Sequence, residues 1–518
     1  MVTDTKGNNT TYTRDKTHNS YAVLTTINAD DTSSSVTYDD KYNVLSETDE
    51  NGKTQHHTYD GNGNVLTDTD EEGKTTNYHY DTQNHVIEKM DPDGTKTTNT
   101  YTGDNLTRSQ IGEEVTQYEY DPYGRQTKVI YPNNTYSTTS YDDANYKVAE
   151  TDAKGNTSAT GYNTYGQTIS ETDGENRTTS YTYNLLNPDI KTSVTDGDGH
   201  KTSYVYDDNG NMTTLTNANG KQKIYSYNGN SQLLTSEFPI TGTTKLKVTN
   251  VYDPNGNLSK VTQNSGIEEN YAYDDVDQLT GVTVKQGGQN VLGWNNTYDG
   301  AGQLTGIAFK NLTSNITLVD KHYAYTANSL LSQYTQGKYV NQYTYDENDR
   351  LASQTLNYNE DTQPFNIQQA LTYTDEGKTK GVDVNASGQS LFVLDYTYDL
   401  KQNKEVIDYN YGLFKNLLTY DEGNHLTSIT YTKGSQTDPT LAFSYVYDKS
   451  GNITKETSKN GTSQYTYDGN HQLTKENLPN GTTNEYQYDA VGNRTSFKQN
   501  GAQTTYLCND GNINWMLS

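Results

Sequence analysis

The sequence predicts an all-β protein built as a long antiparallel meander of β-hairpins. Tyrosine recurs at intervals of about 21 residues, and Asp and a glycine-containing turn usually follow it. A second turn, often Thr-Asp-x-x-Gly, lies within each interval, and many Tyr-Asp pairs are preceded by another tyrosine two residues earlier. A fixed period of this length is typical of stacked repeats, and a spacing of two places both rings on one face of a strand.

Residues 59–80 illustrate one repeat. Tyr59 and Asp60 open a turn that ends near Gly63, a short apolar run follows, and residues 70–73 form the second turn. Asp at the first turn position and Gly at the last favour a type I turn that ends in a left-handed glycine. Two turns in about 21 residues leave two strands of about five or six residues, which is the usual strand length. One repeat is therefore predicted to be a hairpin. We call its two turns the Y-D turn and the T-D turn.

Tyrosine is predicted to supply the core of this meander. The chain has 48 Tyr but only 7 Phe, 4 Met, 2 Trp and 1 Cys. Each buried tyrosine brings a large apolar ring and a hydroxyl that needs a partner. Six residues after the Tyr of most Y-D turns there is an apolar residue, which a five-residue loop would place opposite the ring; Tyr183 is an exception, with Asp189 at that place. The tyrosines assigned to the repeat core are Tyr59, Tyr80, Tyr120, Tyr183, Tyr206, Tyr227, Tyr273, Tyr345, Tyr398, Tyr447, Tyr467 and Tyr488, and the glycines assigned to turns are Gly63, Gly73, Gly210, Gly256 and Gly451.

The number of repeats predicts the shape of the sheet. About 24 repeats give ~48 strands and a sheet ~230 Å long at ~4.8 Å per strand. Twisted sheets rarely exceed ~10 strands without curling, so a spiral or barrel-like wall is expected. Residues 1–230 are regular, residues 231–446 carry longer strands or insertions, and residues 447–518 return to the regular period. We interpret these three sections as one continuous array. Both ends fall within a repeat, so a fragment of a longer protein is expected.

Composition excludes several classes of function. The formal charge of −28 and the lack of basic clusters argue against nucleic acid as a ligand. An acidic chain with 30% hydrophobic residues could be disordered, but disorder gives no reason for periodic tyrosines. No apolar stretch is long enough to span a membrane, and the N-terminus lacks the apolar segment of a signal peptide. The single cysteine, Cys508, excludes an internal disulfide.

No catalytic residue, metal site or cofactor is predicted. Asp60, Asn62, Asn64 and Glu71 have part of the spacing of a calcium loop, but Val65 stands where that loop needs Gly. Asx turns that close hairpins explain these residues better, and the same holds for a weaker acidic pair, Asp196 and Asp198. The adjacent His56 and His57 would point to opposite faces of a strand and cannot share a metal.

Units such as Tyr252–Leu258 and Tyr447–Ile453, each of the form Y-D-x-x-G-N-[LI], resemble the YD repeats of the RHS family. That family includes bacterial Rhs and wall-associated WapA toxins, the C component of insecticidal toxin complexes, and animal teneurins. The resemblance covers residues 3–512. Sparse Arg with plentiful Asn, Thr and Lys is most similar to WapA-type proteins of Gram-positive bacteria.

The resemblance implies a hollow β-shell that encloses a covalently linked C-terminal toxin, in a parent protein that is secreted or associated with the cell wall. The shell itself would not be an enzyme. The family also has a D-P-x-G motif that helps autoproteolytic release. This chain has that motif at residues 91–94, 121–124 and 253–256, all within ordinary repeats, and we interpret the three as turns.

A carbohydrate-binding adhesin of the cell surface or wall is the alternative function. Rows of exposed tyrosine beside Asn and Asp resemble sugar-binding surfaces, because ring faces stack on sugars and amides bind hydroxyls. The two hypotheses differ in where the rings lie. A container needs them packed in its wall or lining its interior, and an adhesin needs an open row.

Overall fold

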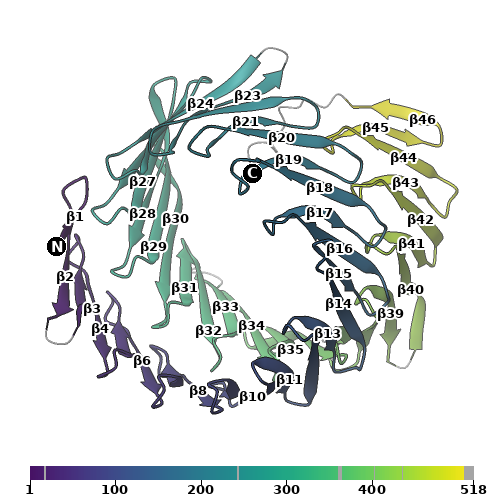
Figure 1. The fold of residues 1–518 in the computed structure, drawn as a ribbon, viewed down its shortest axis with the longest axis horizontal. Helices are drawn as coiled ribbons and strands as arrows, with labels where there is room; N and C mark the ends of the chain where they lie inside the picture. The colour runs from purple at the N-terminus through teal and green to yellow at the C-terminus, as the bar shows by residue number, and fades with distance from the viewer. Residues whose placement is uncertain (17–18, 242–243, 360–363, 402, 435, 507–518) are drawn as a thin grey trace. The chain divides into compact units, whose positions relative to one another are not determined.

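The computed structural model describes residues 1–16, 19–241, 244–359, 364–401, 403–434 and 436–506. These residues contain 46 β-strands (Figure 1). Within the described ranges no helix could cross a membrane. Strands that are adjacent in sequence pair antiparallel, as in the successive pairs β5–β6, β6–β7 and β7–β8. The predicted meander of antiparallel hairpins is therefore confirmed. Cys508 lies outside the described residues.

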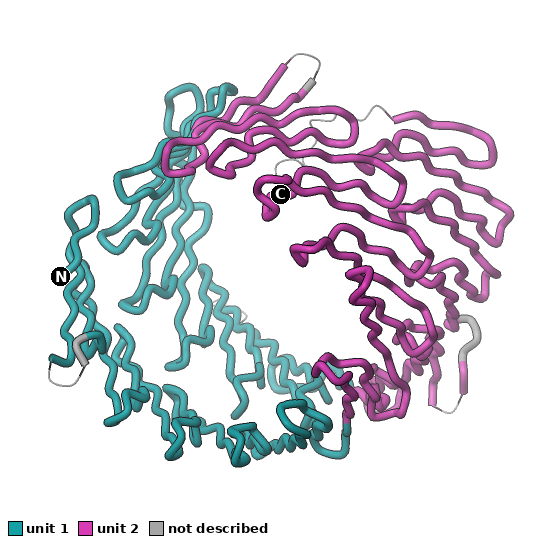
Figure 2. Tube along the Cα trace, in the orientation of Figure 1, with its two compact units in different colours: residues 1–115, 250–394 teal, residues 116–249, 395–518 magenta. Residues whose placement is uncertain are grey.

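The chain forms two compact units (Figure 2). Unit 1 contains residues 1–115 and 250–394, and unit 2 contains residues 116–249 and 395–518. Each unit therefore holds two runs of strands from separate parts of the chain, which we call its first row and its second row. The boundaries between the units fall within β12 (Glu114–Tyr120), β24 (Thr244–Tyr252) and β36 (Gln389–Tyr398).

In unit 1 the first row is β1 (Val2–Thr3), β2 (Asn9–Asp15), β3 (Asn19–Ile27), β4 (Ser33–Tyr38), β5 (Val44–Thr48), β6 (Thr54–Tyr59), β7 (Val65–Thr69), β8 (Thr75–Tyr80), β9 (Val86–Met90), β10 (Lys96–Thr102) and β11 (Asn105–Ile111). Its second row is β25 (Leu258–Gln263), β26 (Ile267–Tyr273), β27 (Leu279–Gln286), β28 (Gln289–Tyr298), β29 (Leu304–Asn311), β30 (Ile316–Tyr325), β31 (Leu331–Gln336), β32 (Tyr339–Tyr345), β33 (Leu351–Tyr358), β34 (Phe365–Tyr373) and β35 (Thr379–Ala386).

In unit 2 the first row is β13 (Gln126–Ile130), β14 (Tyr136–Asp142), β15 (Lys147–Thr151), β16 (Thr157–Tyr162), β17 (Thr168–Thr172), β18 (Thr178–Tyr183), β19 (Lys191–Thr195), β20 (Lys201–Tyr206), β21 (Met212–Thr216), β22 (Gln222–Tyr227) and β23 (Leu233–Thr241). Its second row is β37 (Lys404–Tyr409), β38 (Phe414–Tyr420), β39 (Leu426–Lys433), β40 (Gln436–Tyr447), β41 (Ile453–Ser458), β42 (Gly461–Tyr467), β43 (Leu473–Asn477), β44 (Thr483–Tyr488), β45 (Arg494–Gln499) and β46 (Ala502–Thr505).

Strand lengths differ along the array. Strands β5 to β9 have 5 or 6 residues, whereas β28, β30 and β36 have 10. The division into residues 1–230, 231–446 and 447–518 stays a prediction.

The register of the hairpins places each Y-D tyrosine opposite the residue that follows the turn. Tyr80 pairs with Val86 and Tyr227 pairs with Leu233, as the six-residue spacing predicts. The register shifts by one residue immediately before each of these tyrosines, which is a β-bulge that bends and twists the strand. Tyr183 pairs with Lys191 rather than with residue 189, because its Y-D turn is two residues longer than those that follow Tyr80 and Tyr227.

The Y-D turn is closed by backbone bonds and by its own aspartate. Gly63 N donates to Asp60 O at 3.2 Å, and Asp60 N donates to Asn64 O at 2.9 Å. The Asp60 carboxylate accepts bonds from the backbone N of Asn62 at 2.8 Å and of Asn64 at 2.9 Å. Gly63 has φ of +92°, a conformation that costs a residue with a Cβ. The other assigned turn glycines have φ of +85°, +84°, +94° and +86° at Gly73, Gly210, Gly256 and Gly451.

The three D-P-x-G segments adopt the same kind of turn. Gly94 N donates to Asp91 O at 2.9 Å, and residues 121–124 and 253–256 make the equivalent bond at 3.0 Å. These segments therefore close hairpins in the structure.

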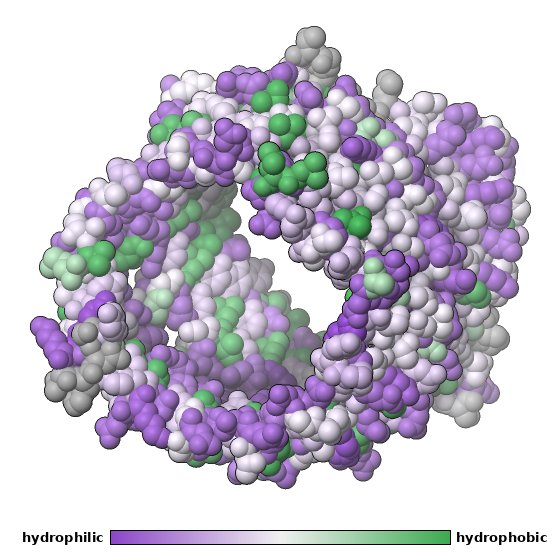
Figure 3. Space-filling model, viewed as in Figure 1, coloured by the Kyte–Doolittle hydropathy of each residue, from purple (hydrophilic) through white to green (hydrophobic). Residues whose placement is uncertain are grey.

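The sheet is a thin wall with few buried side chains. Among the described residues the buried apolar side chains are Leu246, Val282, Val382 and Val393, and no side chain of the described part is less than 2% exposed. The surface seen in Figure 3 is mostly hydrophilic or neutral, with small separate apolar groups. Stability must therefore come from contacts within the sheet and along its edges rather than from a packed core.

The two glycines of the turn at residues 60–63 provide a test of this local geometry. Gly63→Ala should lower the free energy of opening of the β6–β7 hairpin by about 1–2 kcal/mol, because alanine disfavours positive φ. Gly61 lies in the same turn without positive φ and with open space around it, so Gly61→Ala should change that free energy by less than ~0.5 kcal/mol. Hydrogen exchange of the hairpin amides measures both, and equal effects would contradict the assignment.

Candidate functional site: the tyrosine ladder and the inter-row seam

The tyrosines of the Y-D turns link each repeat to the one before it. Tyr227 Oη donates a hydrogen bond to Met212 O at 2.9 Å, and Tyr183 Oη donates to Thr168 O at 2.7 Å. Both acceptors are the first residue of the strand that follows the preceding Y-D turn. We call this series of bonds the tyrosine ladder. It gives each phenol hydroxyl the partner that a half-buried polar group requires. The other tyrosines that make the bond are Tyr59, Tyr101, Tyr141, Tyr206, Tyr273, Tyr298, Tyr325, Tyr345, Tyr373, Tyr447, Tyr467 and Tyr488.

Three of the tyrosines assigned to the repeat core are located by strand pairing or by their position in a strand rather than by a ladder bond. Tyr80 and Tyr120 lie opposite Val86 and Gln126 in their hairpins. Tyr398 is the last residue of β36. Burial raises the pKa of Tyr80 and of Tyr398, as it does for most ladder tyrosines, so these hydroxyls keep their protons at neutral pH.

The other tyrosine of a Y-x-Y pair lies on the same face, and Tyr181 and Tyr396 show the contacts that it can make. Tyr181 Oη donates to Glu171 Oε2 at 2.5 Å; burial and this bond raise the pKa of Tyr181 to about 12. The Lys191 ammonium lies 4.2 Å from the centroid of the same ring, and Lys404 lies 4.3 Å from the ring centroid of Tyr396. The hydroxyl and ring face of Tyr181 and the ring face of Tyr396 are therefore engaged within the sheet.

A second set of contacts joins the two rows of each unit. The T-D turns of the first row meet the Y-D turns of the second row, and the bonded residues lie 247 to 294 positions apart in the sequence. We call this set of contacts the inter-row seam. In this seam the T-D turns come from the first row and the Y-D turns come from the second row. This follows because a hairpin array has its Y-D turns along one edge and its T-D turns along the other.

In unit 1 the seam is charged. Lys6 Nζ, from the first T-D turn, lies 2.8 Å from Asp253 Oδ2 and 2.7 Å from Asp277 Oδ1. Lys74 Nζ lies 2.6 Å from Asp349 Oδ1. Side-chain hydrogen bonds from Lys6, together with its charge, help to lower the pKa of Asp253 and Asp277, so both carboxylates are ionised at neutral pH.

In unit 2 the seam brings backbones into contact. Asp196 and Asp198, considered above as cation ligands, accept hydrogen bonds from Asn470 Nδ2 and from Gly469 N, both at 2.8 Å. A Cβ added to Gly197 would collide with the Gly469 carbonyl oxygen. The approach is therefore closer than any other residue would allow at this position.

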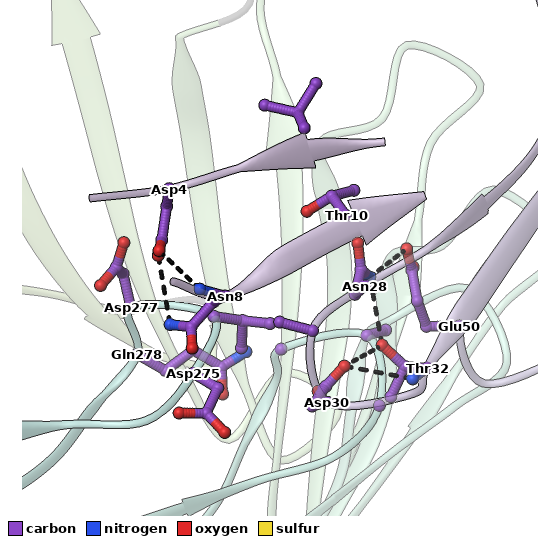
Figure 4. A pocket seen from close by; sticks show the side chains of 16 residues that line it. Asp4, Asn8, Thr10, Asn28, Asp30, Thr32, Glu50, Asp275, Asp277 and Gln278 are labelled. Atoms are coloured by element: carbon purple, nitrogen blue, oxygen red, sulfur yellow. Dashed lines mark hydrogen bonds between the residues drawn. The ribbon is translucent and has the colours of Figure 1, made fainter. Parts of the chain in front are cut away.

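A groove of about 380 Å³ lies along the seam of unit 1 (Figure 4). Its polar side chains are bonded to each other: Asn8 Nδ2 donates to Asp4 Oδ2 at 3.1 Å, and Asn28 Nδ2 donates to Glu50 Oε1 at 3.3 Å. Across the described ranges no group of His, Cys, Asp and Glu has the arrangement of a metal site. We therefore interpret the groove as the border of the inter-row seam.

Two family models match the chain. The RHS Repeat model matches residues 59–96, 192–222 and 447–483, and the Teneurin YD-shell model matches residues 240–377. The chain belongs to the RHS/YD-repeat family. This confirms the resemblance found in the Tyr-Asp units. No curated protein matches the sequence of this YD-repeat chain.

Solved structures share the fold of the YD-repeat chain. A crystal structure titled TcdB2-TccC3-Cdc42 superposes with a TM-score of 0.51 and 14% identity over 96% of this chain and 35% of that chain. A Tc holotoxin pore of Photorhabdus luminescens gives a TM-score of 0.50 and 14% identity, over 96% of this chain and 34% of that chain. This chain spans about a third of the length of those two chains. At this identity the similarity shows a common fold.

Reasoning from the sequence did not find the seam. Its residues were visible only as ordinary turn residues, because their partners lie far away in the sequence. One signal was available: T-D turns of residues 4–220 usually carry Asp with Lys, Arg or Asn, whereas the matching turns of the second rows, such as residues 263–266 and 286–289, lack Asp.

Removing one ladder hydroxyl tests the ladder. Tyr183→Phe should destabilise the β16–β18 region by about 1 kcal/mol, because it removes the bond to Thr168 O. Tyr165, in the preceding Y-D turn, is 73% exposed, so Tyr165→Phe should change stability by less than ~0.5 kcal/mol. Local hydrogen exchange measures both. If Tyr183→Phe leaves local hydrogen exchange unchanged, the Tyr183 hydroxyl does not contribute to the stability of this region.

A double-mutant cycle tests the seam. Lys154 Nζ lies 2.7 Å from Asp421 Oδ2, and we expect a coupling energy of about 0.5–1 kcal/mol between Lys154→Met and Asp421→Asn. The coupling should be seen in the amides of both turns, which lie in different rows. The pair Lys128 and Glu119, 3.1 Å apart within one hairpin, is the control and should affect that hairpin alone. Zero coupling at Lys154 would contradict a charged seam.

The seam should also depend on pH. Burial opposes the charge of Asp421, but hydrogen bonds from Lys154 and from the backbone of His425 outweigh it and lower the pKa of that carboxyl. A carboxylate with a lowered pKa stabilises the folded state above its unfolded pKa of about 4, and this stabilisation is lost as pH falls through the lower folded value. Protection of the seam amides should therefore be constant from about pH 7 to pH 5 and fall below about pH 4. Hydrogen-exchange protection factors measure it, with Asp421→Asn as the variant that should lose part of the dependence.

Proposed function

We propose that this chain is part of the wall of a toxin-delivery protein, and that the wall encloses a toxin segment linked to it in the parent protein. The observation that carries the proposal is the inter-row seam, in a fold shared with the Tc structures. Two rows of hairpins of one chain lock edge to edge, which is how a single-layer sheet can become a closed surface. The matched family models describe structural repeats, so we assign the chain itself no catalytic role.

The details of the wall suit a barrier. At residues 197 and 469 the backbones of the two rows touch, so no water-sized gap separates them there. The ladder bonds tie each repeat to its predecessor along the row. A toxin behind such a wall would be sheltered from proteases.

We further propose that the parent protein is of the WapA type and acts outside the cell or in the wall. The compositional bias toward Asn, Thr and Lys supports this narrower assignment. The tyrosine ladder does not favour the carbohydrate-binding hypothesis. The ladder hydroxyls donate to backbone carbonyls, and the Lys191 ammonium lies over the ring of Tyr181, so these rings do not form an open sugar platform.

Protease protection of the linked segment tests the proposal. In the parent protein, the segment outside residues 1–518 should resist subtilisin in the wild type. Gly197→Ala should accelerate its cleavage about tenfold, because the added Cβ forces the seam open. Gly229→Ala is the matched control: Gly229 holds the same position in a turn where nothing lies within 4 Å, and protection should be unchanged.

Two outcomes would contradict an enclosing wall. One is a segment cleaved as fast in the parent protein as when it is expressed alone. The other is a parent protein that encodes no toxin-like segment beside the repeats.

A further inference from the structure

The turn between β4 and β5 has a tyrosine at the position where Y-D turns usually have glycine. Tyr42 N donates to Asp39 O at 3.1 Å, and Gly63 N makes the same bond in the next Y-D turn. Tyr42 has φ of +67°, in the left-handed region that a bulky side chain rarely adopts. The backbone therefore bears a cost at this position that glycine would avoid. Other Y-D turns that replace the glycine use small polar residues, such as Asn84, Ser231 and Asn424.

The side chain of Tyr42 packs back against the sheet and is half-buried. The centroids of the Tyr42 and Tyr38 rings lie 6.0 Å apart, with an interplanar angle of 48°. Tyr42 Oη donates to Asp15 Oδ2 at 3.1 Å, and Tyr38 Oη donates to Val23 O at 3.2 Å. Burial and the bond to Asp15 raise the pKa of Tyr42, so this hydroxyl keeps its proton at neutral pH. Both hydroxyls are thus bonded within the protein.

A cavity of about 440 Å³ is lined by both of these tyrosines, and we call it the two-tyrosine cavity. Its lining comes from the paired strands β2, β3 and β4 (Figure 1) and from the turn after β4. The lining combines aromatic and aliphatic surface with three carboxylates, and among its described residues there is no Lys or Arg. The lining residues are Asp15, Leu24, Tyr38, Asp39, Asp40 and Tyr42.

Elsewhere in the wall, ladder rings are covered by a cation from the chain itself. The Arg125 guanidinium lies 4.2 Å from the ring centroid of Tyr141, and the Arg350 guanidinium lies 4.7 Å from that of Tyr373. The ladder position of the repeat therefore accepts a positive charge over its ring. Within the described ranges no Lys or Arg lies over the ring of Tyr38. The two-tyrosine cavity thus has the rings and the negative charge of a cation site without a cation of its own.

The charged groups of the turn have separate roles. The Asp39 carboxylate closes the turn, because it accepts bonds from the backbone N of Lys41 at 2.8 Å and of Asn43 at 2.9 Å. The Lys41 ammonium donates to Gly61 O rather than to a carboxylate of the cavity. Asp40 is exposed, so its charge can be removed without opening the turn.

We propose that the two-tyrosine cavity binds a small organic cation with a quaternary ammonium head, such as a trimethylammonium group. The ring faces of the two tyrosines and the Leu24 side chain would contact its methyl groups, and the carboxylates would balance its charge. A primary ammonium is compact and strongly hydrated, so apolar surface compensates poorly for the water that it loses. The backbone cost at Tyr42 is then the cost of placing a second ring beside Tyr38. This site is independent of the proposed enclosing wall.

Binding of choline to the complete 518-residue chain tests the proposal. Choline should bind at least about tenfold more tightly than its neutral isostere, in which carbon replaces the nitrogen, because the two differ in charge and hardly in shape. Titration calorimetry at constant ionic strength measures both. Equal binding of the two compounds, or no binding of choline, would overturn the proposal.

Tyr42→Gly separates the site from the fold. Glycine adopts positive φ freely, which offsets the lost ring contact, so the amides of the β4–β5 hairpin should keep their wild-type hydrogen exchange. Choline binding should nevertheless be lost. The matched control is Tyr411→Gly, because Tyr411 has φ of +57° but is 81% exposed in an outer turn of the second row. Full choline binding in Tyr42→Gly, or its loss in Tyr411→Gly, would overturn the site.

Asp40→Asn tests the charge of the cavity. Loss of one nearby carboxylate should weaken choline binding about threefold and leave binding of the neutral isostere unchanged. An equal change for both compounds would contradict an electrostatic role of Asp40.

The trimethylammonium head occurs in free solutes and on phosphatidylcholine. Co-sedimentation of the chain with phosphatidylcholine vesicles distinguishes these sources, with phosphatidylglycerol vesicles as the control. Binding to phosphatidylcholine that Tyr42→Gly abolishes would assign a lipid head group as the ligand. Binding of free choline without binding to these vesicles would assign a soluble cation.

Discussion

The hydrogen bond from a phenol hydroxyl to the backbone of the preceding repeat is the interaction on which the wall depends. A hairpin of two short strands is marginally stable alone, and this sheet has almost no buried core to add to it. The tyrosine side chain stabilises the hairpin and also supplies apolar contact that a core would otherwise provide. Its ring covers the apolar residue across the hairpin, and its hydroxyl satisfies a carbonyl at the start of an earlier strand. Each repeat is thereby held by its predecessor as well as by the strand ladder.

The inter-row seam stabilises each unit in a second direction. Strand pairing and the tyrosine ladder act along a row, whereas the seam acts across it, between residues that lie 247 or more positions apart in sequence. Because the two turn types lie on opposite edges, the rows can meet in one orientation only. Ion pairs such as Lys154 with Asp421 set the register, and close backbone contacts such as Gly197 with Gly469 set the spacing. Specific order in the wall therefore follows from small differences between two very similar turns.

The sequence was informative about local structure and silent about distant contacts. The 21-residue period, the Y-x-Y spacing and the Asp and Gly positions predicted hairpins and their register, because these features depend on neighbouring residues. The need of each tyrosine hydroxyl for a partner was also predictable, but the acceptor was not, since any carbonyl carries the same chemistry. Lys6 and Asp253 could not be paired from sequence, because the match depends on how many repeats separate the rows. The six-residue spacing places residue 189 opposite Tyr183, whereas the structure has Lys191 there, because the turn between them is longer.

The absence of a common interior among the described residues has a consequence for how such a chain can change. In a globular domain one enlarged side chain disturbs many others. Among the described residues each hairpin contacts its immediate neighbours and one or two turns of the facing row, so damage stays local and energies add nearly linearly. Duplication or loss of a complete hairpin pair alters length and leaves the remaining repeats intact. Such a sheet can be lengthened or shortened by recombination in steps of about 21 residues.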